Sequence, residues 1–361
     1  MNIEKRSARF GAALLIFAVL LRLVGGVWMP QADALGLLDV IRGGFSPHRP
    51  SGGVSIGPSA TVRIPTVPTV GTTLPTVSTT APTVSTAPTV PTMPTVPTAP
   101  PQVQTPPAIT FAQEDLAYVK FRVATDCGYT VDLQSLLLQP LQWQLAGEEP
   151  TVLIIHSHAT ESYEKQPEDA YTESDFYRTL DTGYNMVAVG DLLAEQLRQR
   201  GIGVIHDRQI HDYPSYNAAY VNSGRSVEEY LQAYPSIRMV LDLHRDAAPN
   251  PDGSQFATSA TVDGQRSAQI MLLSGSDWTG TSHPAWQKNL SLALKLQVLL
   301  EREHPGITRR TVLRGCAFNQ YLSTGMLIVE IGTAGNTLAE ALRAVPPLAD
   351  AIGALCWGAE S

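Results

Sequence analysis

A proline-rich repeat divides this sequence into a part that can bury a core and a part that cannot. Over residues 50–107 the unit Pro-Thr-Val recurs, and residues 64–113 contain no charged side chain. Such a segment has too little bulky apolar surface to offset the entropy of ordering it, and its prolines favour an extended, semi-stiff chain. We therefore predict a disordered linker over residues 30–107, with a glycosylated stalk as the alternative, and a folded domain over residues 108–361.

The N-terminus has the pattern of a membrane anchor. Lys5, Arg6 and Arg9 precede an apolar run over residues 10–29, and about 20 apolar residues suffice to cross a bilayer. The basic flank predicts that residues 1–9 stay in the cytoplasm and that everything after the span lies outside it. A cleaved signal peptide is the alternative.

Composition limits the class of partner. The hydrophobic fraction of 43% is enough for a sizeable core, and the net charge of -8 argues against nucleic acid, which needs a basic face. The three cysteines Cys127, Cys316 and Cys356 are odd in number and far apart. This spacing argues against a disulfide scaffold or a cysteine zinc site and favours buried free thiols.

Within the folded domain, short apolar runs alternate with amphipathic helical patterns. This order predicts an α/β domain, with a mostly parallel sheet flanked by helices. The predicted strands are residues 151–155, 202–205, 239–243, 270–274 and 326–331, and the predicted helices are 184–200, 226–232, 284–303 and 337–356.

Polar side chains follow or end three of these strands. His158 and Glu161 follow the first, His244 ends the third, and Glu330 lies near the end of the last. Ligand groups of α/β sheets gather at the carboxyl ends of strands, and imidazole and carboxylate are good zinc ligands. We therefore predict a zinc site made of His158, Glu161 and His244, with Glu330 as the general base for amide hydrolysis.

Other polar residues are weaker candidates. His156 lies two residues before His158, so it could replace that residue as a ligand or support the site. His211 and Asp212 could form a substrate wall. Arg245 could bind a substrate carboxylate, since arginine suits bidentate contacts. Asn319 could hydrogen-bond a peptide backbone.

Five segments together resemble one family, the stage II sporulation protein P family, over about residues 148–356. They are HSHATESY, HDYPSYNAAYVNSGRSVEEYL, VLDLHRDA, FNQYLSTG and LIVEIGTAGNTLAEAL. The resemblance implies a fold similar to that of N-acetylmuramoyl-L-alanine amidases and zinc carboxypeptidases. It makes His158 and His244 metal ligands and Glu330 the catalytic residue. The assignment of Glu161 as the third ligand rests on carboxypeptidase-like spacing, and Asp181 and His211 stay open as alternatives for this ligand.

The resemblance also implies a function. The expected enzyme cuts the amide between muramic acid and the stem peptide of peptidoglycan, and also cross-links between stems. It would act at the sporulation septum and engulfing membrane, with stage II sporulation proteins D and M as partners. Two alternatives remain: a zinc carboxypeptidase acting on free peptides, and a catalytically inert wall-binding module.

Overall fold

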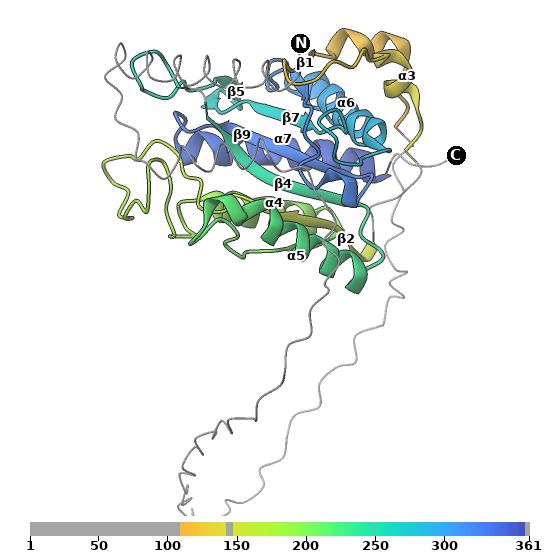
Figure 1. The fold of residues 1–361 in the computed structure, drawn as a ribbon. Helices are drawn as coiled ribbons and strands as arrows, with labels where there is room; N and C mark the ends of the chain where they lie inside the picture. The colour runs from red at the N-terminus through yellow and green to blue at the C-terminus, as the bar shows by residue number, and fades with distance from the viewer. Residues whose placement is uncertain (1–108, 142–146, 248, 358–361) are drawn as a thin grey trace, which may run out of the picture. The chain divides into compact units, whose positions relative to one another are not determined.

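A seven-stranded sheet organises the folded part of the chain, seen in a computed structural model that describes residues 109–141, 147–247 and 249–357 (Figure 1). Its strand order is β1-β8-β7-β9-β4-β2-β3. The strands are β1 (Phe121–Val123), β2 (Gly147–Ile155), β3 (Ile202–His206), β4 (Met239–Asp246), β7 (Ile270–Ser274), β8 (Thr311–Leu313) and β9 (Met326–Thr333).

The prediction of a mostly parallel sheet is confirmed. β9, β4, β2 and β3 are parallel to one another, and so are β1, β8 and β7. The two parallel groups meet where β7 pairs antiparallel with β9. β1 and β8 were not predicted, because strands of three residues are too short to show a periodic pattern. A separate hairpin, β5 (Ala260–Val262) and β6 (Gln265–Ser267), was also not predicted.

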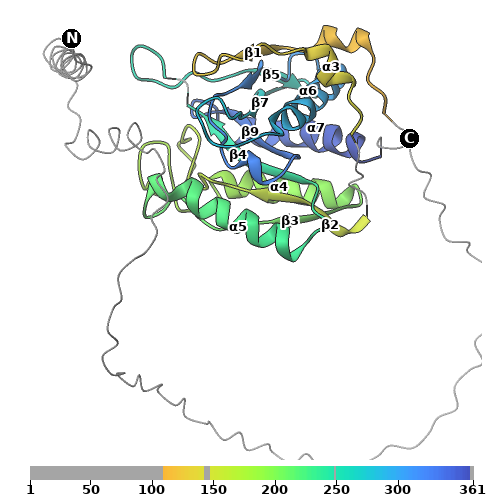
Figure 2. The ribbon, with the colours of Figure 1, turned by 45° about the vertical axis from the view of Figure 1, so that its right-hand side comes forward.

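Helices cover both faces of the sheet. The α-helices are α3 (Leu133–Leu138), α4 (Met186–Gln199), α5 (Ala219–Ala233), α6 (Trp286–Glu303) and α7 (Leu338–Trp357), and the 3-10 turns are η1 (Gln113–Tyr118), η2 (Tyr216–Ala218) and η3 (Gln320–Leu322). Buried side chains of α4, α6 and α7 share one core cluster, whereas α5 contributes to a second one. α3 and β1 lie at the far end of the sheet from β3 (Figures 1 and 2).

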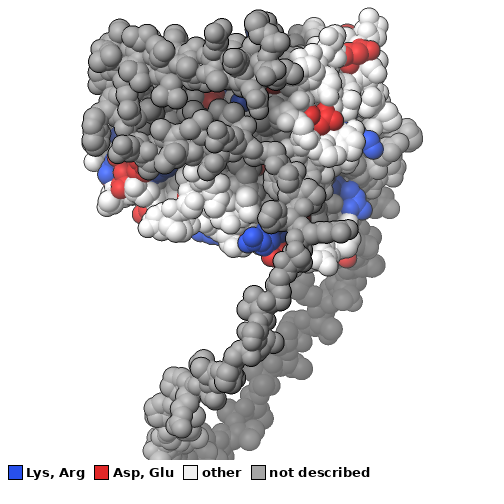
Figure 3. Space-filling view, in the orientation of Figure 1, with Lys and Arg blue, Asp and Glu red and all other residues white. Residues whose placement is uncertain are grey.

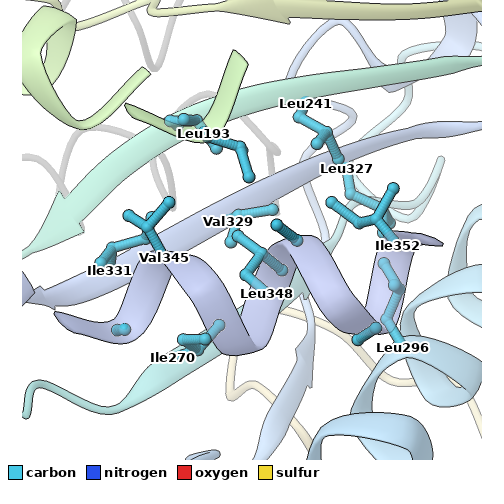
Figure 4. Close-up of a cluster of buried hydrophobic side chains, with 14 of the residues drawn as sticks. Leu193, Leu241, Ile270, Leu296, Leu327, Val329, Ile331, Val345, Leu348 and Ile352 are labelled. Atoms are coloured by element: carbon cyan, nitrogen blue, oxygen red, sulfur yellow. The ribbon is translucent and has the colours of Figure 1, made fainter. Parts of the chain in front are cut away.

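The main core lies between α7 and the middle of the sheet. Leu348 and Val345 of α7 face Val329 and Ile331 of β9, and Leu193 of α4 closes the cluster (Figure 4). All five side chains are fully buried. Because β9 and β4 are apolar on this face, burial there fixes the positions of the strands whose ends carry polar residues.

Two local predictions were wrong. The helix predicted over residues 226–232 begins at Ala219, because it continues directly from η2 and has no capping side chain to mark its start. Ser226, expected as its cap, is buried inside it. Cys127 is buried as predicted, but Cys316 is exposed, on the loop after β8.

The predicted anchor and linker lie outside the described residues. Within the described ranges no helix is long and apolar enough to span a bilayer. On the face in Figure 3, acidic and basic side chains of the described residues are interspersed among uncharged ones.

Candidate functional site

The strand order brings the predicted chemistry to one place. β9, β4 and β2 are neighbours and parallel, so their carboxyl ends lie side by side. His244 of β4 is in register with Glu330 of β9. His158 and Glu161 come from the turn that follows β2. Side chains far apart in sequence thus meet at one edge of the sheet.

Two of the predicted ligands are spaced as zinc ligands are. Nδ1 of His244 lies 3.4 Å from Oε2 of Glu161. Bonds of about 2.1 Å at a tetrahedral angle separate two ligand atoms by about 3.4 Å. The rings of His158 and His244 have centroids 5.5 Å apart, and all three side chains are buried.

Asp242 faces His244 from the other side of the ring. Its Oδ1 lies 2.9 Å from Nε2 of His244, although the two atoms are not aligned as a regular hydrogen bond. Ser157 fixes this carboxylate by donating from its backbone N–H (2.7 Å) and its hydroxyl (2.6 Å). A proton on Nε2 would leave the lone pair of Nδ1 facing Glu161, the arrangement that a metal-binding histidine needs.

Glu161 is an ionised carboxylate in this setting. Burial opposes its ionisation, but the charge of Arg245 and the contact with His244 outweigh burial and hold the pKa of Glu161 well below its usual range. Arg178 Nη2 also lies 3.7 Å from Oε1 of Glu161. The carboxylate is therefore available as an anionic ligand.

The environment of His244 favours a positive charge. Burial alone would lower the pKa of His244, but the carboxylates of Asp242 and Glu161 raise it well above its ordinary value. A proton and a metal ion compete for the same lone pair. The two carboxylates would thus favour a positive charge on this ring, whether it is a bound proton or a bound metal ion.

Glu330 differs from Glu161 in having no basic partner in contact. Burial raises the pKa of Glu330 to about 8. Although the residue as a whole is partly exposed, its Oε2 atom is buried and has no hydrogen-bond partner. A carboxyl group with a pKa near neutrality, on the strand position in register with His244, is suited to taking up and releasing a proton.

The donor types fit a metal ion better than their present arrangement does. Nδ1 of His158 is buried without a hydrogen-bond partner, and its nearest ionic neighbour is Oδ2 of Asp212 at 3.7 Å. Within residues 109–141, 147–247 and 249–357, no three His, Cys, Asp or Glu side chains are grouped so that they could hold a metal ion as arranged. The types of donor atom and the unpaired Nδ1 of His158 fit a zinc ion. The ring of His158, however, faces Asp212 in this structure, so the three side chains do not form a metal site as arranged.

The three predicted substrate-binding residues all contact protein groups. Arg245 donates to the carbonyls of Ser162 and Tyr177 and faces Glu161. His211 donates from Nε2 to Oδ2 of Asp207 at 3.0 Å, and Asn319 donates to the carbonyl of Tyr220. In this structure they support the walls of the site.

The alternative ligands lie apart from the cluster. His156 is fully buried, donates from Nδ1 to the carbonyl of Leu243, and has its Nε2 atom 2.8 Å from Nε2 of His206. Asp181 lies on an exposed turn, where it accepts from the N–H of Gly183.

Two residues that contact the predicted metal ligands, Asp242 and Arg178, were not predicted from the sequence. Asp242 stands two residues before His244 on the same strand, so its side chain lies on the same face, and this spacing was a usable signal. Arg178 donates to Asp212 at 2.8 Å and lies in a loop with no distinctive pattern. The ring of Tyr216 stacks on His158 at 4.3 Å.

Two of the solved structures that this chain matches are amidases. The chain matches the CwlD amidase of Clostridioides difficile, solved with the GerS lipoprotein, at 13% identity and a TM-score of 0.36, over 57% of this chain and 98% of that one. It matches the N-acetylmuramoyl-L-alanine amidase AmiC2 of Nostoc punctiforme at 12% identity and a TM-score of 0.35, over 58% and 96%.

Sequence comparison is more specific. The stage II sporulation protein P of Bacillus subtilis (strain 168) is 27% identical over 228 residues, which are 60% of this chain and 54% of that protein. The chain thus spans about half the length of this curated relative. The family model of stage II sporulation protein P matches residues 102–353. This chain therefore belongs to the stage II sporulation protein P family.

Proposed function

We propose that this chain is a zinc-dependent peptidoglycan hydrolase that cleaves the amide between N-acetylmuramic acid and L-alanine during sporulation. One observation carries the proposal: His158, Glu161, His244 and Glu330 meet at the ends of three neighbouring parallel strands. Membership of the family supports the substrate class.

Each residue of the cluster would have a distinct task. His158, Glu161 and His244 would hold the zinc ion, with Asp242 keeping the ring of His244 in place. A zinc ion bound there would polarise the scissile carbonyl and lower the pKa of the attacking water.

Glu330 would move the proton. Ionised at Oε2, it accepts a proton as water adds to the amide carbon, and it then gives that proton to the amide nitrogen as the C–N bond breaks. The products are the lactyl carboxylate of muramic acid and the free amino group of L-alanine. A nearby dication would favour the ionised form of Glu330 before the reaction.

The location and partners belong to the same proposal. We place the domain outside the cytoplasm, tethered by the anchor over residues 10–29 and the linker over residues 30–107. Stage II sporulation proteins D and M are the expected partners, and cleavage of stem-peptide cross-links is an expected second activity.

Digestion of purified peptidoglycan tests the reaction. The full chain, purified in detergent because of the expected anchor, should release stem peptides with a free L-alanine amino group, as identified by mass spectrometry. A chelator should stop the release, and added zinc should restore it. Equal cleavage of free peptides that lack muramic acid would favour the carboxypeptidase alternative, and no cleavage by the zinc-loaded chain would favour the inert wall-binding module.

A further inference from the structure

A pocket of about 350 Å³ opens beside the cluster of ligands. Its walls come from the loop that contains Asp175 and Arg178 and from the loop that contains Tyr213 and Tyr216. A volume in this range holds a small ligand or one unit of a polymer.

The floor of the pocket is joined to the candidate metal site. Asp212 lines the pocket, accepts from the hydroxyl of Thr160 and from Arg178, and lies 3.7 Å from Nδ1 of His158. A ligand in the pocket would therefore contact Asp212 and Tyr216, which themselves contact His158. This position suits the part of the substrate next to the scissile bond.

Two exposed tyrosines border the pocket. Tyr213 is 56% exposed and Tyr216 is 53% exposed. Tyr216 is held by its stack on His158 and by the guanidinium of Arg178, 4.5 Å from its ring centroid. Large aromatic side chains exposed next to a pocket are typical of binding surfaces. A tyrosine offers an apolar face and a hydroxyl, which match the two kinds of group on a sugar ring.

The charges of the lining select between the two halves of peptidoglycan. The charge of Arg178 is balanced by Asp212 at 2.8 Å, which leaves the exposed carboxylate of Asp175 as the unbalanced charge among the lining side chains. The stem peptide carries free carboxylates, whereas the glycan ring is uncharged. The carboxylate of Asp175 opposes the carboxylates of the peptide, and its Oδ2 atom can accept a sugar hydroxyl.

We propose that this pocket is the subsite for a sugar ring of the glycan strand, with Tyr213 as the side chain that contacts the ring. The proposal rests on peptidoglycan being the substrate, and it adds which half of the substrate the pocket holds. The pocket would place the glycan on the His158 side of the cluster and leave the peptide to the opposite side.

Binding of peptide-free glycan strands tests the subsite, because such strands contain no bond that the proposed reaction cuts. Titration calorimetry on the full chain should show binding that Tyr213→Ala weakens about three- to tenfold, the loss expected for one aromatic contact. Tyr213→Phe should keep most of the affinity. Tyr234→Ala is the matched control, since Tyr234 is 41% exposed at the far end of α5 and should have no effect.

The outcomes separate this proposal from the proposed reaction. No binding of glycan by the wild type, unchanged binding by Tyr213→Ala, or a loss confined to free stem peptide would each overturn the subsite. If glycan binding depends on Tyr213 but peptidoglycan is not hydrolysed, the reaction fails and the subsite stands.

Discussion

Replacing Gly190 with alanine should destabilise the domain, against the usual preference of helices for alanine. Gly190 lies within α4, where its lack of a side chain leaves room for two histidine rings. A Cβ atom at this position would lie 2.4 Å from Nε2 of His206 and 2.6 Å from Nε2 of His156. Both distances are far inside van der Waals contact, so the rings must move apart.

The expected size follows from three contributions. Alanine in a helix gains about 1 kcal/mol over glycine, overpacking costs about 1–3 kcal/mol, and breaking the contact between the buried His156 and His206 rings costs about 1–3 kcal/mol. Gly190→Ala should therefore lower the free energy of unfolding by about 1–5 kcal/mol. His156 also donates to the carbonyl of Leu243, next to His244, so the strain reaches the candidate site.

Urea unfolding of the full chain, followed by circular dichroism, measures this effect. Gly353→Ala is the matched control, because it also lies in a helix and its added Cβ meets only Arg200 Cδ, at 3.3 Å. That variant should be unchanged or slightly more stable. In a His206→Ala background, Gly190→Ala should cost at least about 1 kcal/mol less, since one clash is gone. A stability of Gly190→Ala equal to the wild type, or an equal cost in both backgrounds, would refute this reasoning.

Three further predictions concern single side chains. Glu330→Gln should reduce hydrolysis of peptidoglycan at least about 100-fold, as expected for loss of a general base, while its far-UV circular dichroism stays unchanged; activity near the wild type would exclude the assigned role. Asp242→Asn should weaken zinc affinity about 10- to 100-fold, measured by competition with a chromophoric chelator, and an unchanged affinity would contradict its orienting role. Lys295 is 1% exposed, and burial lowers its pKa from 10.5 to about 8. Between pH 8 and 10.5 the unfolded chain therefore binds the proton of Lys295 more tightly than the folded chain does. The free energy of unfolding should rise by up to about 3 kcal/mol over this pH range. This rise, followed by urea unfolding, should be absent in Lys295→Met, and a similar rise in both would count against a buried charge at this position.

The long apolar strands and the residues at their ends could be predicted from sequence. β4 and β9 each begin with a run of apolar residues and carry polar residues toward their ends, so His244 and Glu330 were visible as candidates. The partners of the polar cluster were harder to predict. Asp212 reaches His158 across two loops whose path depends on tertiary packing, and Arg178 lies in one of these loops.

The role of the predicted substrate-binding residues stays a prediction. Arg245 was expected to bind substrate because arginine suits carboxylates, but in the fold the nearest carboxylate is the protein's own Glu161. The antiparallel pairing of β7 with β9 was also not predictable, because a buried strand has the same apolar pattern in either direction.

Zinc content is the most direct test of the central claim that His158, Glu161 and His244 form a metal site. Elemental analysis of the full chain, after dialysis against buffer without metal, should find about one zinc ion per chain in the wild type and clearly less in Glu161→Gln. The glutamine variant keeps the shape of the side chain and removes its charge. A wild type without zinc, or a Glu161→Gln variant with the same zinc content as the wild type, would contradict the claim.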